Sequence, residues 1–349
     1  VLIGAVLRIC AIGLAMIYST AGGAGRVYWR QVYALGLGLI AMAVAVTFDY
    51  RSLADKSHWI YLAMMILLVA VLFFGSVRGG SRRWIDLGFF NLQPSEFAKA
   101  TLALMLAKML GEERRPALTN NDLFIAASLT AVPFLIIARQ PDLGTAVTLL
   151  PILLVVAYVA GMPMKYIYAM VIVAVLAAPV AYKFALQDYQ RERISTFLDP
   201  AQDPKGAGYQ QIQARITVGS GGMWGKGFMQ GTQGQLRFLP VAHNDFIFSV
   251  LAEEQGLIGV LVALGLYFFV IMRALDAARL AKDRLGAYLV LGVLSSFTFQ
   301  VIYNITMSAG LAPVKGLTLP LMSYGGSSMI ATLAGFGLIL NVRMRRFTN

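Results

Sequence analysis

One short stretch lies where a long polar segment gives way to an apolar one: Phe238-Leu239-Pro240-Val241-Ala242-His243-Asn244-Asp245-Phe246-Ile247-Phe248. The polar segment, residues 185–245, interrupts a chain that is otherwise almost wholly hydrophobic. The stretch therefore predicts that Asp245 and His243, one of only two histidines, lie where a water-exposed loop meets a membrane span. A carboxylate held at that boundary can act as a general base on a hydroxyl of a lipid-linked substrate. The alternative is that Asp245 only caps the helix that follows it.

The composition is that of a membrane protein. Hydrophobic residues make up 58% of the chain and charged residues 13%, whereas soluble domains carry about 25% charged residues. We expect an all-α, polytopic integral membrane protein in which residues 1–349 form one domain. Residues 185–245 form a large extracytoplasmic loop between the seventh and eighth spans. Ten segments are apolar enough to be read as spans, namely residues 1–19, 31–48, 58–74, 95–110, 124–139, 144–161, 166–184, 246–272, 286–305 and 323–342.

Charge sets the expected orientation and partners. With ten spans both termini lie on one side, and the connections on that side carry more lysine and arginine than the short connections opposite. We therefore expect the termini in the cytoplasm. A net charge of +12 would suggest nucleic acid in a soluble protein, but here the charges lie between spans, which favours membrane lipids or a diphosphate as partners. No signal peptide is evident, and because Val1 begins inside an apolar run, we expect that a short native N-terminus precedes it.

A charged pair is expected within the fourth span. Glu96 and Lys99 are three residues apart, after Pro94 and Ser95, which suit the start of a helix. The two charges therefore share one helix face. A charge inside a span costs about 2.5–3.5 kcal/mol on insertion scales, so embedded charges indicate function by default. We expect both residues to contact substrate, and the alternative is a structural ion pair at the mouth of the helix.

Residues 139–145 form a tight connection between two spans. Pro141 breaks the first helix, and Asp142 can cap the second. Arg139 and Asp142 could instead face a common aqueous cavity, and the sequence leaves the two interpretations equal.

Two glycine-rich tracts lie in the polar segment, at residues 206–211 and 219–227. Glycine lets backbone amides approach an anion closely, so a phosphate site is conceivable there. The tracts lack the spacing of a nucleotide-binding loop, and this signal is weak on its own.

The last stretch rich in glycine and proline covers residues 310–328, after Asn304. This density predicts an irregular, protein-packed segment rather than a lipid-facing helix. Lys315 is its only charge and could meet a diphosphate. Two further acids, Glu253 and Glu254, lie about two helical turns beyond Asp245, Glu253 about 80° around the helix from it and Glu254 about opposite it. We expect them to be buried in pairs with other groups rather than to work with Asp245.

Together these stretches resemble the SEDS family, the RodA/FtsW/SpoVE membrane proteins of bacterial cell-wall synthesis. The resemblance covers nearly the whole chain. Its anchors are Asn304, Gly310, Pro313, Gly316 and residues 323–328, with residues 93–99, 140–145, 219–222 and 243–248 in family order. Residues 231–240 are most similar to the RodA branch, whereas residues 315–320 are closer to FtsW, and we favour RodA. Two positions depart from the family pattern: Asn244, where Thr is usual, and Val241, where Glu is usual.

The resemblance implies a peptidoglycan glycosyltransferase that polymerises lipid II on the outer face of the bacterial cytoplasmic membrane during cell elongation. The donor would be the growing glycan linked to undecaprenyl diphosphate, and the acceptor the GlcNAc 4-hydroxyl of lipid II. Asp245 matches the essential aspartate of the family and would deprotonate that hydroxyl. Attack at the anomeric carbon would then invert α to β, with the diphosphate as leaving group.

The same resemblance suggests roles for other residues. Cations must stabilise the charge that develops on the diphosphate. The substrate-binding residues would be Glu96, Lys99, Arg193, Arg215, Lys226, His243, Lys315 and Ser323, with Arg82 as a further cation, while Asp142, Pro313, Gly325 and Gly326 would shape the cavity. No acidic cluster demands a metal, so no metal ligand is assigned, although a divalent cation (Mg²⁺ or Mn²⁺) could share the work.

The family also implies a protein partner, a class B penicillin-binding protein that supplies transpeptidation. Two other classes of function compete with the enzyme. A ten-span protein with a polar cavity could flip lipid II across the membrane, or it could be a non-catalytic scaffold for the penicillin-binding protein. The Asp245→Asn variant discriminates among the three, because only the enzyme requires this base.

Overall fold

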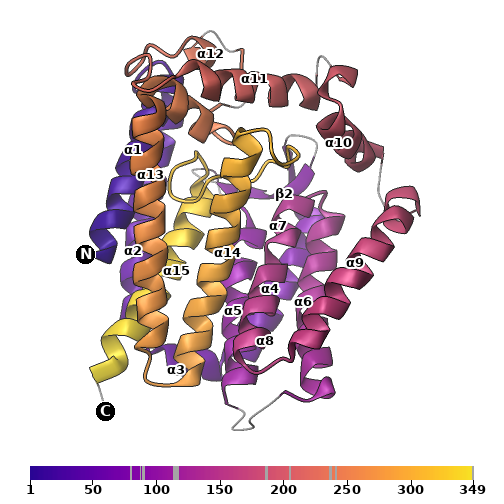
Figure 1. The fold of residues 1–349 in the computed structure, drawn as a ribbon. Coiled ribbons are helices and arrows are strands. Elements are labelled where there is room, and N and C mark those ends of the chain that lie inside the picture. The colour runs from indigo at the N-terminus through magenta and orange to yellow at the C-terminus, as the bar shows by residue number, and fades with distance from the viewer. Residues whose placement is uncertain are drawn as a thin grey trace.

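Long apolar helices stand side by side and make up most of the structure (Figure 1). The computed structural model describes residues 1–78, 81–86, 88, 91–112, 118–184, 188–203, 206–235, 238–239 and 242–347. Pro240 and Val241 of the stretch quoted above, and Leu236 beside it, lie outside the described residues. The helices are α1 (Leu2–Thr20), α2 (Arg26–Thr47), α3 (Tyr50–Asp55), α4 (Ser57–Phe74), α5 (Pro94–Gly111), α6 (Asn120–Arg139), α7 (Leu143–Val147), α8 (Leu149–Val159), α9 (Met164–Phe184), α10 (Asp188–Leu198), α11 (Ala207–Ser220), α12 (Thr232–Gln235), α13 (Ile247–Arg279), α14 (Arg284–Ser308) and α15 (Gly326–Met344).

Within the described part of the chain, seven helices are long and apolar enough to cross a membrane: α1, α2, α4, α6, α13, α14 and α15. The protein is therefore a multi-pass membrane protein. Helix α5 is also 18 residues long, but Glu96, Lys99 and Lys108 make it less apolar. Helices α7 and α8 together form a shorter apolar pair. Every expected span overlaps a helix, while the number of ten spans remains a prediction.

A small antiparallel sheet joins α4 to α5, which the expected all-α class did not include. Its strands are β1 (Ser76–Arg78), β2 (Ser81–Asp86) and β3 (Asn91–Leu92), in the order β1-β2-β3. The strands are too short to leave a strong alternating pattern in the sequence. The sheet matters because β2 presents successive side chains to opposite faces.

The polar segment 185–245 also contains regular structure. It holds α10, a 3₁₀ turn at Pro200–Gln202, α11 and the single turn α12. Figure 1 shows these elements across one end of the helix bundle, with α3 at the opposite end. Helix α11 packs against α13 and α14. The segment is therefore a folded cover over that end of the bundle.

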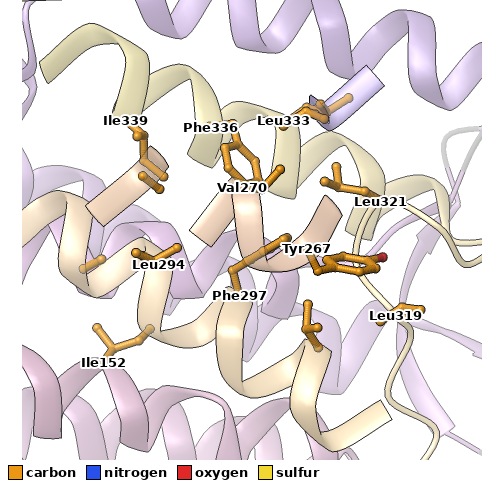
Figure 2. Close-up of a cluster of buried hydrophobic side chains, with 14 of the residues drawn as sticks. Ile152, Tyr267, Val270, Leu294, Phe297, Leu319, Leu321, Leu333, Phe336 and Ile339 are labelled. Carbon is orange, nitrogen blue, oxygen red and sulfur yellow. The ribbon is translucent and has the colours of Figure 1, made fainter. Parts of the chain in front are cut away.

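The core beneath this cover joins α13, α14 and α15 (Figure 2). Phe297 of α14 lies between Tyr267 and Phe336, with ring centroids 6.1 and 5.1 Å away. The hydroxyl of Tyr267 donates to the carbonyl of Pro320 at 2.7 Å. Buried aromatic rings contribute much of the packing energy in such a core. Here they also fix the irregular segment 309–325 to the helices.

Candidate functional site

Asp245 lies immediately before α13 and is not used as its cap. The residue that begins this helix is Phe246, and no side chain caps it. Asp245 is instead fixed through its main chain, because the amide of Asn304 donates to its carbonyl at 2.9 Å and to that of Leu317 at 2.7 Å. Gly316, with φ +65°, lies beneath the carboxylate, and a Cβ on it would stand 3.5 Å from Asp245 Oδ2. The carboxylate is therefore held in place yet available for chemistry.

The surroundings of Asp245 set its charge state. Burial raises its pKa from 3.8 to about 6, and the positive charges of Arg83 and Arg193 act in the opposite direction. The residue as a whole keeps partial solvent exposure, so water and substrate have access to it. A base with a pKa close to the working pH combines a large ionised fraction with useful basicity.

Arg83 enters the site from β2. Its Nη1 lies 3.2 Å from Oδ2 of Asp142. The neighbouring Arg82 turns away, as strand alternation requires, and its Nη1 donates to the carbonyl of Phe73. Asp142 thus has Arg83 as its charged partner, while a cavity shared by Asp142 and Arg139 stays a prediction. Arg83 was missed because its strand was not expected; alternation along residues 81–86 would have separated it from Arg82.

Asp142 has the capping role that the sequence offered and also pairs with groups of other elements. Its carboxylate caps α7 by accepting from the amide of Thr145 at 3.2 Å and from its hydroxyl at 2.9 Å. It also accepts from Gln93 Nε2 at 2.8 Å and faces Arg83. A Cβ on Gly144, in the same turn, would lie 3.0 Å from the carbonyl of Lys315. The turn at residues 141–144 therefore packs on the segment that carries Gly316.

Lys315 and Arg193 bring further positive charge to this region. Lys315 Nζ lies 6.0 Å from the ring centroid of Tyr303, whose hydroxyl donates to the carbonyl of Pro313 at 2.8 Å. Burial lowers the pKa of Lys315, and the charge of Arg193 lowers it further. Arg193 also acts on Asp245. The structure thus brings Asp245, Arg83, Arg193 and Lys315 into one electrostatic neighbourhood.

His243 and Ser323 belong to the turn that supports this neighbourhood. The carbonyl of His243 accepts from the amide of Tyr324 at 2.9 Å, and the two rings meet edge to face with centroids 5.6 Å apart. Burial lowers the pKa of His243, which keeps it neutral. The hydroxyl of Ser323 accepts from the amide of Leu319 at 2.9 Å. Gly325, just before α15, donates its amide to Gln31 at 3.1 Å, and Gly326 begins that helix.

Glu96 and Lys99 form the expected pair on one face of α5. Their charged atoms are 2.8 Å apart and both side chains are buried. Lys99 also donates to Gln300 Oε1 on α14 at 3.0 Å. The pair lines a small cavity of about 30 Å³ between α5, α14 and α15. Among the described residues the pair bonds to α14 and not to Asp245, so it forms a second polar centre.

The other two predicted cations have protein partners. Lys226 Nζ lies 2.7 Å from Oε1 of Glu253, which is fully buried, and 2.8 Å from the hydroxyl of Thr232. Arg215 of α11 packs its side chain on Gly310, where an added Cβ would lie 2.3 Å from Arg215 Cδ. The expectation that Glu253 is buried in a pair is confirmed. The contacts of these two cations are thus with Glu253, Thr232 and Gly310 rather than with Asp245.

The second glycine-rich tract completes a broken helix. Gly256, with φ 64° and ψ −165°, interrupts α13. Residues 226–227 donate their amides to the carbonyls of residues 253–254 at 2.9 and 3.0 Å. Residues 257–258 donate theirs to the carbonyls of residues 222–223 at 2.9 and 3.3 Å. Four backbone groups at the break are thus satisfied by residues 222–227, which we call the splice segment.

Glycine is required in this splice for close approach. A Cβ on Gly221 would lie 1.9 Å from the carbonyl oxygen of Ala252, and one on Gly225, with φ +79°, 2.2 Å from that of Glu254. Glu254 itself accepts a hydrogen bond from Ser19 of α1. The glycines of this tract therefore serve backbone packing, and the amides of residues 226–227 are not available to an anion.

No group of three or more His, Cys, Asp or Glu side chains that could hold a metal ion occurs among the described residues. Asp245 and Asp142 face the same cation, Arg83, which is an arrangement for charge pairing. A divalent cation at the site remains an expectation from the family resemblance.

Comparison with known proteins identifies the family. The model of the FtsW/RodA/SpoVE proteins, described as "Cell cycle protein", matches residues 1–347. The chain belongs to this family. It is 40% identical over 331 residues to the peptidoglycan glycosyltransferase MrdB of Escherichia coli K12, covering 95% of this chain and 89% of that protein. It is 38% identical over 320 residues to a probable peptidoglycan glycosyltransferase FtsW of Geobacter metallireducens, covering 90% and 84%.

Solved structures agree with this assignment. The chain superposes with a TM-score of 0.87 and 36% identity on a chain from a peptidoglycan synthase complex described for its coordination of polymerization and crosslinking, covering 100% of this chain and 98% of that one. It superposes on the rod shape determining protein RodA of Thermus thermophilus with a TM-score of 0.76 and 33% identity, covering 100% and 97%. The FtsW/RodA/SpoVE fold therefore extends over the whole chain.

Proposed function

We propose that this chain is a peptidoglycan glycosyltransferase that polymerises lipid II, with Asp245 as the general base. The observation that supports this most is the state of Asp245: it caps no helix, its main chain is fixed by Asn304, and Arg83 and Arg193 act on its carboxylate. The named activity of the relatives MrdB and FtsW supports the same reaction.

In the proposed reaction Asp245 takes the proton from the GlcNAc 4-hydroxyl of lipid II. The oxygen attacks the anomeric carbon of the donor glycan from the side opposite the diphosphate, forming the β-glycosidic bond. The bond from that carbon to the phosphate oxygen breaks, and its electron pair leaves with undecaprenyl diphosphate. The ionised carboxylate supplies a proton acceptor at the moment when the new bond forms.

Arg193 and Lys315 are the cations best placed to stabilise the leaving diphosphate. Both belong to the neighbourhood of Asp245, and positive groups near the leaving diphosphate lower the energy of a transition state in which negative charge develops. We keep substrate contact by His243, Ser323, Arg215, Lys226, Glu96 and Lys99 as a prediction. Because these side chains already have partners in the protein, we expect their removal to act on the shape of the site as well.

The proposed site lies on the outer face of the cytoplasmic membrane, with the termini in the cytoplasm. Figure 1 supports opposite sides for the site and the C-terminus, because the polar cover formed by α10, α11 and α12 lies at one end of the bundle, and the C-terminus and α3 at the other. A class B penicillin-binding protein is the proposed partner, since the related synthase complex carries out polymerization and crosslinking together.

Fluorescent lipid II supplied to the purified protein, with and without its cognate penicillin-binding protein, tests the proposal. We expect glycan ladders from the wild type, no ladder from Asp245→Asn, and a wild-type ladder from the control Asp188→Asn, whose carboxylate is fully exposed on α10. Size-exclusion profiles and melting temperatures establish that the variants fold. Ladders from Asp245→Asn would remove this residue as the base. Absence of ladders from the wild type, with and without the partner, would contradict the polymerase and direct attention to lipid II transport.

A further inference from the structure

We propose that Arg83 and Asp142 form a fixed electrostatic support for Asp245: Asp142 orients the guanidinium of Arg83, and the guanidinium stabilises the Asp245 carboxylate. Arg83 is then a positioning residue for the base, and Asp142 acts through Arg83. This inference rests on the proposed function, because it assigns the support to the residue that takes the proton.

Asp142 is built as an anchor. Its side chain is 3% exposed and accepts from Gln93 Nε2 and from both the amide and the hydroxyl of Thr145. These three donors come from the start of α5 and the start of α7, two separate elements that hold the carboxylate from different directions. A carboxylate fixed in this way cannot follow Arg83, so the guanidinium must settle against it. The position of Arg83 is therefore determined by Asp142.

The guanidinium keeps donor capacity beyond this ion pair. Arg83 approaches Asp142 through Nη1 at 3.2 Å, and its Nε is buried without a hydrogen-bond partner among the described residues. The turn that carries Asp142 packs on the segment beside Asp245: a Cβ on Gly144 would lie 3.0 Å from the carbonyl oxygen of Lys315, and one on Gly316 would lie 3.5 Å from Asp245 Oδ2. The ion pair therefore lies near the Asp245 carboxylate, on which the charge of Arg83 acts.

Two charged groups act on Asp245 from different elements, Arg83 from β2 and Arg193 from α10. The charge of Arg193 also acts on Lys315, in the segment before α15, and on Tyr303 of α14. His243 lies two residues before Asp245 and is held neutral by burial. Asp142 contributes negative charge through its pairing with Arg83.

Arg83 differs from Arg193 in its exposure to solvent. Arg193 is exposed on α10, where solvent and salt screen its charge. Arg83 has a side chain that is 26% exposed and that contacts a buried anion. A charge with a fixed position keeps its effect when the substrate enters and water leaves, which a screened surface charge does not. The support of Asp245 is therefore assigned to Arg83.

The pH dependence of polymerisation tests this support. Initial rates at low lipid II concentration are measured from pH 5 to pH 9 for the wild type, Arg83→Gln, Arg83→Lys and Arg82→Gln. Removal of a nearby positive charge favours the protonated carboxyl, so we expect the acid limb of the Arg83→Gln profile to move to higher pH by about one unit. The loss of rate is then about tenfold larger on the acid side than on the plateau. Arg83→Lys, which keeps the charge, should leave the limb near that of the wild type.

Arg82→Gln is the matched control, because it removes the same charge one residue away on the other face of β2. Its acid limb should coincide with that of the wild type. A merely structural role of Arg83 would lower the rate by the same factor at every pH, and an unshifted limb in Arg83→Gln would overturn the proposal. A wild type that makes no glycan at any pH would instead contradict the proposed function itself.

A second pair of variants covers the case in which Arg83→Gln fails to fold because it leaves Asp142 buried and unpaired. Asp142→Asn removes the anion alone, and the double variant Arg83→Gln with Asp142→Asn leaves a neutral pair. These two proteins differ only by the charge of Arg83. We expect the limb of the double variant to lie at higher pH than that of Asp142→Asn, and equal limbs would refute the support.

Discussion

The side-chain amide of Asn304 donates to the main-chain carbonyl of Asp245 at 2.9 Å. The same amide reaches Leu317 at 2.7 Å, so one buried residue of α14 fixes the proposed base and the segment beneath it. We call these two hydrogen bonds of Asn304 the clamp. Because the clamp holds the base through its main chain, it makes no hydrogen bond to the carboxylate. Geometry and reactivity are thereby assigned to different atoms of the same residue.

Replacing the clamp should impair activity more than folding. In Asn304→Leu the carbonyls of Asp245 and Leu317 lose their donor, at a cost of about 1–3 kcal/mol for each buried group left unpaired. We expect a lower melting temperature and a loss of glycan ladders that exceeds the fraction of unfolded protein. Thr306→Val is the control, since that hydroxyl bonds only carbonyls of its own helix. Normal ladders from Asn304→Leu would show that the clamp is dispensable.

Asp245 should also destabilise the protein at neutral pH. Burial raises its pKa from 3.8 to about 6, so the folded state holds this proton more tightly than the unfolded state does. The resulting cost is complete above about pH 6 and is relieved as the pH falls toward 4. At about 1.4 kcal/mol per pKa unit it amounts to at most about 3 kcal/mol. We expect Asp245→Asn to melt at a higher temperature than the wild type at pH 8, with the difference vanishing near pH 4. A variant that melts lower at pH 8 would contradict the burial of this charge.

The splice segment predicts a sharp difference between two glycines of the same tract. Gly225→Ala places a Cβ 2.2 Å from the carbonyl oxygen of Glu254 at a positive φ, and should cost roughly 2–4 kcal/mol. Gly219→Ala lies in the last turn of α11 with open space around it and should be neutral or stabilising by about 0.5–1 kcal/mol. Melting temperatures of the two variants decide this. Equal melting temperatures would mean that the close approach is not needed for folding.

The second polar centre should behave as a coupled pair. Glu96→Met or Lys99→Met alone leaves one buried charge without its partner, which costs about 3–5 kcal/mol. The double variant removes both charges and should cost much less than the two single changes added together. A thermal double-mutant cycle in detergent measures the coupling. Additive effects would show that the two charges are stabilised independently of each other.

The features that were predictable from the sequence depend on local pattern. Long apolar runs gave the helices, the spacing of three placed Glu96 and Lys99 on one face, and the sequence around Asp142 indicated a cap. Each of these depends on neighbours within a few residues. The signature stretches around Asp245 and residues 310–328 added the family, which the comparisons confirmed.

The features that could not be predicted from the sequence depend on contacts between positions far apart in the chain. Arg83 joins Asp142 across 59 residues and lies on a strand too short to be recognised. The break in α13 at Gly256 lies within an apolar run. The residues that bond to the main chain at this break lie about 30 residues earlier, in a glycine-rich tract that only weakly suggests a phosphate site. Pairing at this range leaves no periodic signal, so glycine chemistry alone could not separate anion binding from backbone packing.

The splice also has a bearing on how the chain is assembled during synthesis. Residues 222–227 emerge from the ribosome before α13 and must reach the same side of the membrane as the upper part of that helix. If this segment is retained on the wrong side of the membrane, four main-chain groups of α13, the carbonyls of residues 253–254 and the amides of residues 257–258, stay without hydrogen bonds. Each such group costs about 1–3 kcal/mol. Correct translocation of the polar segment therefore stabilises the protein, because it allows these hydrogen bonds across the break in α13 to form. The continuity of α13 across Gly256 thus depends on where residues 222–227 are placed relative to the membrane.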